Sequence, residues 1–176
     1  MNLDWMKSDD NPLTLIIMRG IPASGKSYRA KELSGGDDSV IFSADYYYGR
    51  TKEEYVKNWN PAKIGLAHES CQAGVRKAMQ DRCPLVIVDN TNTMVREMTP
   101  YFRMAVQYGY KVRIEEPTSP WWLNDIAPYL TDKVKYKAEL DKAAEFLTEK
   151  SKETHCVPLE AIQRMLGRYV PNVTFD

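Results

Sequence analysis

Residues 20–27 read Gly20-Ile21-Pro22-Ala23-Ser24-Gly25-Lys26-Ser27. This run fits the pattern G-x-x-x-x-G-K-[ST] of a phosphate-binding loop, or P-loop. An apolar run at 13–18 precedes it and predicts a buried strand, and residues 27–33 can begin a helix. The motif requires this order, because the helix N-terminus adds its positive dipole end to the backbone N–H groups of the loop. The loop therefore predicts a nucleoside triphosphate site formed by residues 20–28, of which Tyr28 is the last.

Two side chains of the loop have expected roles in this chemistry. Lys26 is expected to reach the β- and γ-phosphates, and the Ser27 hydroxyl is expected to hold Mg²⁺. ATP and Mg²⁺ are therefore the cofactors that the loop predicts. The loop by itself does not specify what is done with the nucleotide.

The bulk composition narrows the class of protein. A length of 176 residues suggests one domain, and 24 basic against 24 acidic residues give no net charge. Neutrality argues against a strongly basic coat for nucleic acid and leaves a local positive groove possible. Residues 1–12 lack the features of a signal peptide and no apolar run is long enough to span a membrane, so we expect a cytoplasmic protein with no membrane partner. The three cysteines are expected to be free thiols, without zinc spacing.

The remaining pattern alternates strands and helices. Strands are predicted at 39–42, 85–89 and 110–114, and helices at 62–80 and 94–108. The run at 85–89 lacks alternation, which is typical of a central parallel strand. The sequence thus predicts a three-layer α/β P-loop NTPase fold, with a mostly parallel sheet and helices on both faces.

The rest of the chain completes the expected domain organisation. Residues 51–60 are predicted to be a charged loop, and residues 122–130 and 132–152 to be helical. The Lys- and Glu-rich region at about 121–155 is either a lid over the γ-phosphate or a plain solvated face. A last helix is expected from Pro158. The expected division is a lead-in at 1–12, a kinase domain at 13–170 and a tail at 171–176.

Two carboxylates follow predicted strands. In open parallel sheets, ligands bind outside the carboxyl ends of the strands, so Asp45 and Asp89 should share one rim with the P-loop. Asp45 could accept a proton from a hydroxyl that attacks the γ-phosphate, or it could be a helix cap. Asp89 could contact Mg²⁺ or hold Ser27, or it could form an Asx turn.

An aromatic patch follows Asp45. Residues 46–50 contain three tyrosines and Arg50, which could stack on a base and hold a substrate phosphate. Part of this patch must pack inward as core. His68, on the predicted helix at 62–80, is expected to be an ordinary core histidine.

With these residues laid out, the chain resembles a polynucleotide-kinase-type P-loop kinase. The resemblance spans about residues 13–169 and extends to phage polynucleotide kinases, the N-terminal kinase-like domain of the myelin cyclic-nucleotide phosphodiesterase, and the kinase domain of a Smr-linked ubiquitin-ligase-binding family. The matching segments are Gly20–Ser27, Ser43–Tyr47, Ala67–His68, Val88–Asn92, Glu97–Tyr101, Gly109–Tyr110, Glu116–Pro117, Trp121–Trp122 and His155–Pro158.

The resemblance implies phosphate transfer from ATP to a 5′-hydroxyl of RNA or DNA. It assigns Lys26 to the phosphates, Ser27 to Mg²⁺ and Asp45 to the general base, and it brings the loop containing Asn90 and Asn92 against substrate or metal.

The chain departs from the family pattern at two cationic positions. Tyr48 stands where the phage pattern has an acceptor-binding arginine, and Arg50 could take the place of that arginine. The family's lid arginine has no counterpart between residues 114 and 163, and Lys150 or Lys152 could supply a point charge instead. Two alternative functions stay open: a kinase for another hydroxyl (a modified base in DNA, a nucleoside or a sugar), and a non-catalytic nucleotide-binding adaptor.

Overall fold

The computed structural model describes residues 10–174 and contains one parallel sheet. Residues 1–9 of the expected lead-in and 175–176 of the expected tail lie outside the described residues. The strands are β1 (Thr14–Met18), β2 (Ile41–Phe42), β3 (Leu85–Val88) and β4 (Lys111–Glu115), in the order β2-β3-β1-β4. Leu15 pairs with Val86 on one side and Val112 on the other. The P-loop strand is therefore an inner strand, and β4 is an edge strand.

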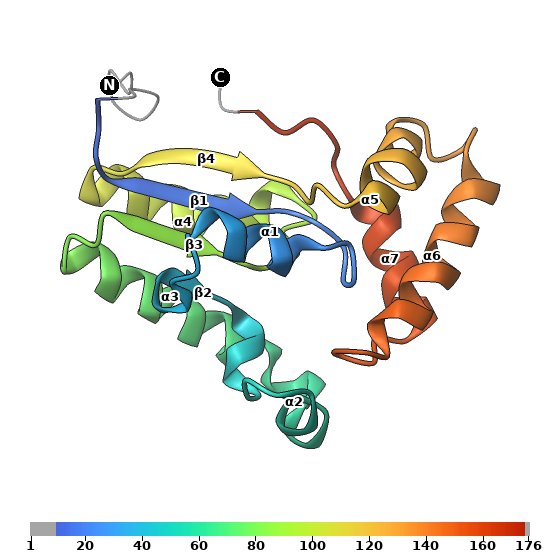
Figure 1. Cartoon of the computed structure of the whole chain (residues 1–176), viewed down its shortest axis with the longest axis horizontal. Coiled ribbons are helices and arrows are strands. Elements are labelled where there is room, and N and C mark those ends of the chain that lie inside the picture. Colours follow the sequence, from blue (N-terminus) through green and yellow to red (C-terminus); the bar gives the residue numbers. More distant parts are fainter. Residues whose placement is uncertain (1–9, 175–176) are drawn as a thin grey trace.

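Helices cover both faces of this sheet (Figure 1). Alternate residues of β1 point to opposite faces, and both sets are buried: Leu15 and Ile17 pack in the cluster that includes α3 (Ile64–Gln80) and α4 (Val95–Tyr108). Ile16 and Met18 pack toward α1 (Lys26–Leu33). The predicted three-layer α/β fold is confirmed.

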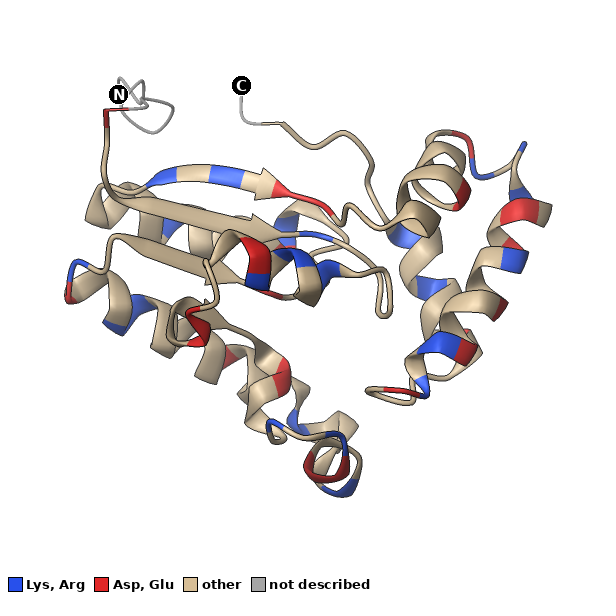
Figure 2. Cartoon of the chain, in the orientation of Figure 1, with Lys and Arg blue, Asp and Glu red and all other residues tan. Residues whose placement is uncertain are grey.

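The C-terminal helices form a second unit beyond the carboxyl ends of the strands (Figure 1). It contains α5 (Pro120–Asp125), the 3₁₀ segment η5 (Ala127–Thr131), α6 (Lys137–Ser151) and α7 (Leu159–Arg168). Its core is separate from the sheet's core and is built around Trp122, which is fully buried. Figure 2 shows blue and red interspersed along α6, so this helix has no single-sign face.

The predicted helices at 122–130 and 132–152 were partly wrong. α5 ends at Asp125 and is followed by η5, because Pro128 has no N–H and its ring would clash with the carbonyl of residue 124 in a continued α-helix. Residues 132–136 form a turn in which the Asp132 carboxylate accepts the Lys135 N–H, and α6 begins at Lys137.

A buried arginine joins the helical unit to the rim of the sheet. Arg19 follows β1, is 1% exposed, and donates from Nε to the Asn92 carbonyl (2.8 Å) and from Nη2 to the Thr93 carbonyl (3.0 Å). Its guanidinium also lies 4.5 Å from the Tyr169 ring centroid at the end of α7. Nearby, the Tyr169 hydroxyl donates to Glu116. One side chain thus connects β1, the β3–α4 loop and α7.

The prediction of a loop at 51–60 was wrong, because helix α2 occupies Lys52–Asn58. Thr51 accepts the backbone N–H of Glu54, and the Glu54 carboxylate accepts the backbone N–H of Thr51. This capping box satisfies two donors that a helix start otherwise leaves unpaired. Its spacing, Thr-x-x-Glu, was visible in the sequence. Two short 3₁₀ segments, η3 (Ala44–Tyr47) and η4 (Pro61–Lys63), flank this part of the chain.

Loss of the cap should loosen α2. We expect Thr51→Ala to lower the free energy of unfolding by about 1 kcal/mol, because the Glu54 N–H loses its acceptor. Thr51→Ser, which keeps a hydroxyl, should remain close to the parent protein. Urea unfolding and amide exchange of α2 measure this, and equal effects of Ala and Ser would contradict the capping role.

Candidate functional site

The P-loop has the backbone shape of a phosphate cradle. Gly25 has a left-handed backbone (φ +92°) and is the N-cap residue of α1. Because no side chain caps this helix, the N–H groups of its first turn are open to a ligand. A Cβ at Gly20 would lie 2.7 Å from the Ser24 Oγ and 2.9 Å from the Pro117 Cγ, and so would not fit. The Ser24 Oγ is buried and has no hydrogen-bond partner in the described chain. The loop therefore combines tight packing with an unsatisfied polar atom and open N–H donors.

The helical unit holds the outer side of this loop. The Ser119 hydroxyl donates to the Ser24 carbonyl (2.7 Å), and the Trp121 indole N–H donates to the Ala23 carbonyl (3.1 Å). Ile21 is fully buried in the core of the helical unit. These two bonds hold the loop carbonyls outward. The shape of the P-loop therefore depends on α5 and its N-cap as well as on the glycines of the loop.

The loop lysine meets the carboxylate that ends β3. Lys26 Nζ donates to Asp89 Oδ1 at 2.5 Å, and these side chains are 10% and 6% exposed. Ser27 is exposed at the start of α1, and within the described chain Asp89 bonds to Lys26 rather than to Ser27. The donor set suits Mg²⁺, which is held by one or two oxygen ligands together with substrate phosphates and water. No group of three His, Cys, Asp or Glu side chains in residues 10–174 is placed to hold a metal by itself.

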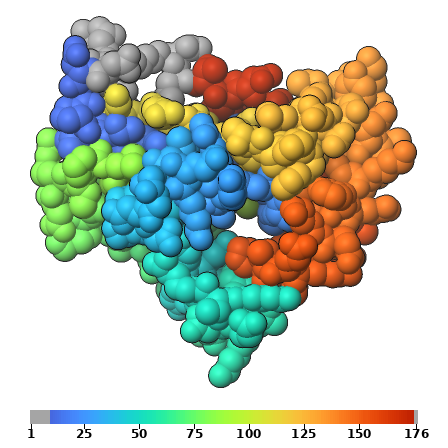
Figure 3. Space-filling view, in the orientation of Figure 1, coloured from blue at the N-terminus to red at the C-terminus, as the bar shows by residue number. Residues whose placement is uncertain are grey.

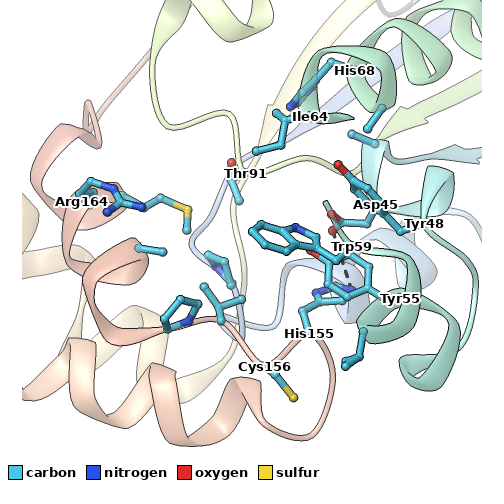
Figure 4. A pocket seen from close by; sticks show the side chains of 18 of the residues that line it. Asp45, Tyr48, Tyr55, Trp59, Ile64, His68, Thr91, His155, Cys156 and Arg164 are labelled. Atoms are coloured by element: carbon cyan, nitrogen blue, oxygen red, sulfur yellow. Dashed lines mark ion pairs between the residues drawn. The ribbon is translucent and has the colours of Figure 1, made fainter. Parts of the chain in front are cut away.

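A pocket of about 610 Å³ opens beside the loop (Figure 4). It lies between the α2–α3 region and the α7 side of the helical unit, where the space-filling view is hollowed between the teal and orange-red surfaces (Figure 3). Pro22 of the P-loop reaches its wall. Its lining is mainly apolar and aromatic, and its polar and aromatic members are Asp45, Tyr48, Tyr55, Trp59, His68, Thr91, His155, Arg164 and Arg168.

Asp45 faces this pocket and is its one carboxylate among the described residues. The helix cap at this point is Ser43, whose hydroxyl oxygen accepts the Asp45 N–H, so the Asp45 carboxylate itself is not the cap. That side chain is 43% exposed and lies 3.9 Å from the Nε2 of His155 (Figure 4). Burial, and next the Asp45 charge, raise the pKa of Tyr48 and of Tyr55. These phenols therefore stay protonated and do not compete with Asp45 as proton acceptors.

Tyr48 and Arg50, the two residues after Asp45 that were suggested to contact the acceptor, differ in position: Tyr48 lines the pocket and Arg50 does not. Tyr48 is in the pocket wall but 3% exposed, and its hydroxyl donates to the Asn60 carbonyl (3.3 Å). Arg50 is outside the lining, with its guanidinium stacked 3.6 Å from the Tyr46 ring centroid. The aromatic patch therefore packs inward in part, as expected, and it does not bring Arg50 to the pocket.

Asn90 and Asn92 are buried and hold the rim together. The Asn90 side-chain oxygen accepts the Ala44 N–H (2.9 Å), and its amide donates to the Tyr101 hydroxyl (3.2 Å). The Asn92 amide donates to the Met18 carbonyl (2.8 Å). Neither lines the pocket. In this structure their side chains tie the start of η3, next to Asp45, and the end of β1, before the P-loop, to the loop after β3.

The two lysines suggested as lid cations, Lys150 and Lys152, lie at the end of α6 and do not line the pocket. Lys150 Nζ is 4.6 Å from the Trp121 ring centroid, and Lys152 pairs with Glu149 at 2.5 Å. The cations in the pocket wall are Arg164 and Arg168 of α7. Tyr28, expected near the nucleotide, is 71% exposed on α1.

Sequence reasoning assigned no role to Tyr55, Trp59, Arg164 or Arg168, although all four line the pocket. The available signals were the capping box that begins α2 and the four-residue spacing of the two arginines, which brings them to one side of α7. His155 was noted only as part of a motif, and it now lies beside Asp45 and against the Tyr55 ring, 4.3 Å between centroids.

Comparison with known proteins agrees with this geometry. The AAA domain family model matches residues 15–123. Human NEDD4-binding protein 2 is 33% identical over 112 residues, covering 62% of this chain and 6% of that protein. The 2′,3′-cyclic-nucleotide 3′-phosphodiesterase is 30% identical in Rattus norvegicus and 31% identical in Pongo abelii, over 159 and 163 residues. Those alignments cover 80% of this chain and 36% of each enzyme.

The chain thus spans well under half the length of these relatives. No helix between residues 10 and 174 has the length and apolarity needed to cross a membrane. The family match covers the P-loop, all four strands and the start of the helical unit, and the two relatives come from groups that the sequence motifs predicted. The chain belongs to this AAA domain family, as a P-loop kinase-like domain of nucleotide-related function.

Proposed function

We propose that this protein is an ATP-dependent phosphotransferase that moves the γ-phosphate to a hydroxyl acceptor, namely the 5′-OH of RNA or DNA. The observation that carries the proposal is the shared pocket: Asp45 and the P-loop residue Pro22 line one space. Kinase chemistry needs little more than positioning and charge stabilisation around a transferring phosphoryl group, and a carboxylate that accepts the hydroxyl proton. The phosphodiesterase relatives are named for their action on 2′,3′-cyclic nucleotides, which supports a nucleotide acceptor.

The proposed roles follow from the chain's own groups. Asp45 takes the proton as the acceptor oxygen forms its bond to the γ-phosphorus, and the bond from that phosphorus to the ADP oxygen breaks. Lys26 leaves Asp89 for the phosphates and offsets the charge that develops on the leaving ADP. The N–H groups at the start of α1 hold the phosphate oxygens. Ser27 and Asp89 are the residues that would hold Mg²⁺, which would supply neutralisation of the phosphate charge when bound.

A small hydroxyl compound is the second candidate acceptor. The pocket volume of about 610 Å³ suits one nucleoside-sized molecule, and the chain has no net charge with which to attract a long polyanion. The helical unit, which contacts the P-loop, is the proposed lid in both cases.

One experiment tests the proposal. The protein is incubated with Mg²⁺ and ATP labelled at the γ-phosphate, together with 5′-OH RNA, 5′-OH DNA, modified-base DNA and free nucleosides. Label on an oligonucleotide 5′ end supports the first candidate, and label on nucleosides alone selects the second. ATP binding without transfer to any of these hydroxyls would overturn the kinase proposal in favour of a nucleotide-binding adaptor.

A further inference from the structure

The two arginines of the pocket differ in how their charge is used. Arg168 donates from Nε to the Thr93 hydroxyl (2.9 Å), and its Nη2 lies 3.9 Å from the Glu97 carboxylate. Arg164, one turn earlier on α7, forms no side-chain hydrogen bond or ion pair within residues 10–174. The one pocket carboxylate, Asp45, is near His155 instead. Arg164 is therefore an exposed cation on the pocket wall that has no ion-pair partner within the described chain.

The facing wall presents aromatic rings. Trp59, at the end of α2, is 47% exposed although it is a large apolar side chain. Figure 4 shows its indole projecting into the middle of the pocket, with Arg164 across the pocket on α7. An exposed indole in a pocket is a platform for a flat ring, because stacking replaces water on both apolar faces.

We propose that this pocket binds the acceptor as one nucleotide, with its base stacked on Trp59 and an anionic phosphate held by Arg164. The inference rests on the proposed function and specifies its acceptor: a nucleotide that carries a phosphate on the side away from the reacting hydroxyl. A free 3′-phosphate and the first phosphodiester of a strand share this chemistry. The cation for this phosphate comes from α7, more than 100 residues after Asp45, and not from the segment at 46–50.

The shape and charge of the pocket support a single nucleotide. A volume of about 610 Å³ lies within the usual range for small-ligand sites and leaves no room for a stacked duplex. The fork of N–H donors on a guanidinium matches two phosphate oxygens, and the bond is charge-assisted. An uncharged nucleoside would gain the stacking contact but leave Arg164 without a partner.

Calorimetric binding without ATP tests the subsite. The ligands are adenosine, adenosine 3′-monophosphate and the dinucleotide ApA, which has a free 5′-hydroxyl. The parent protein should bind the two phosphate-bearing ligands about 10- to 100-fold more tightly than adenosine, since hydrogen bonds to charged groups are among the strong ones. Arg164→Ala should abolish that difference and leave adenosine binding unchanged, whereas Trp59→Ala should weaken all three ligands by about tenfold.

Two further variants make the test selective. Arg164→Lys should keep part of the preference, because an ammonium retains the charge without the fork. Arg103→Ala removes an exposed arginine of α4 outside the pocket and should change nothing. Equal affinity of the parent protein for adenosine and its 3′-monophosphate, or equal losses for all ligands in Arg164→Ala, would overturn the subsite.

The binding test is independent of phosphate transfer. Tight 3′-phosphate binding in a protein that transfers no phosphate would refute only the kinase proposal. Transfer without any preference for a 3′-phosphate would refute only the Arg164 subsite. A preference for adenosine 3′-monophosphate without one for ApA would restrict the acceptor to mononucleotides.

Discussion

Asp45→Asn is expected to lower the rate of phosphate transfer by about 10²–10⁴-fold, the usual contribution of a general base. An amide cannot accept the proton that the attacking hydroxyl must lose, and Asp45 is the one carboxylate in the pocket wall of the described chain. ATP affinity should be unchanged, because the phosphate cradle at 20–27 is intact. Single-turnover transfer of labelled γ-phosphate measures the rate, and calorimetry measures ATP binding.

A control separates this effect from a general loss of acidic charge. Asp38→Asn removes an exposed carboxylate of a neighbouring segment that does not line the pocket, and it should leave transfer unchanged. An unchanged rate in Asp45→Asn would remove Asp45 as the base. A loss of ATP binding in that variant would show that Asp45 acts on the nucleotide instead.

Lys26→Met should affect both stability and transfer. The Lys26–Asp89 pair is nearly buried, so removing the lysine leaves an uncompensated carboxylate and should lower the free energy of unfolding by about 3–5 kcal/mol. Loss of the cation at the phosphates should lower the transfer rate by about 10²–10³-fold. Urea unfolding and single-turnover transfer measure the two effects separately.

The double variant Lys26→Met with Asp89→Asn distinguishes the two roles of Lys26. Because it has no unpaired buried charge, it should regain most of the lost stability while remaining defective in transfer. A single variant as stable as the parent would contradict the buried pair. Recovery of transfer in the double variant would contradict the role of Lys26 at the phosphates.

The fold could be predicted because its signals are local. The apolar runs of β1 and β3 and the glycines of the P-loop each determine their own backbone over a few residues, and parallel strands then follow from the intervening helices. α2 was missed although Thr51 and Glu54 give a cap signature, because its charged composition resembles a loop. The break at Pro128 could also have been anticipated from the missing N–H.

The candidate site could be predicted only for residues that directly follow a predicted strand or belong to the P-loop. Asp45 and Asp89 follow strands, so their place at the rim was expected, and the structure adds that Asp89 pairs with Lys26. The roles suggested for Arg50 and Lys150 rested on closeness in sequence to a missing arginine. Ring contacts with Tyr46 and Trp121 hold both side chains outside the pocket.

The sequence by itself determined the phosphate cradle and the parallel sheet, because short-range backbone preferences and strand periodicity suffice for both. Only the tertiary structure decided which side chains face Asp45. Trp59 and Arg164 lie on one pocket although about a hundred residues separate them. They line the same pocket because the core around Trp122 and the buried Arg19 hold α7 against the rim of the sheet. Packing between two cores sets that distance, and no local pattern encodes it.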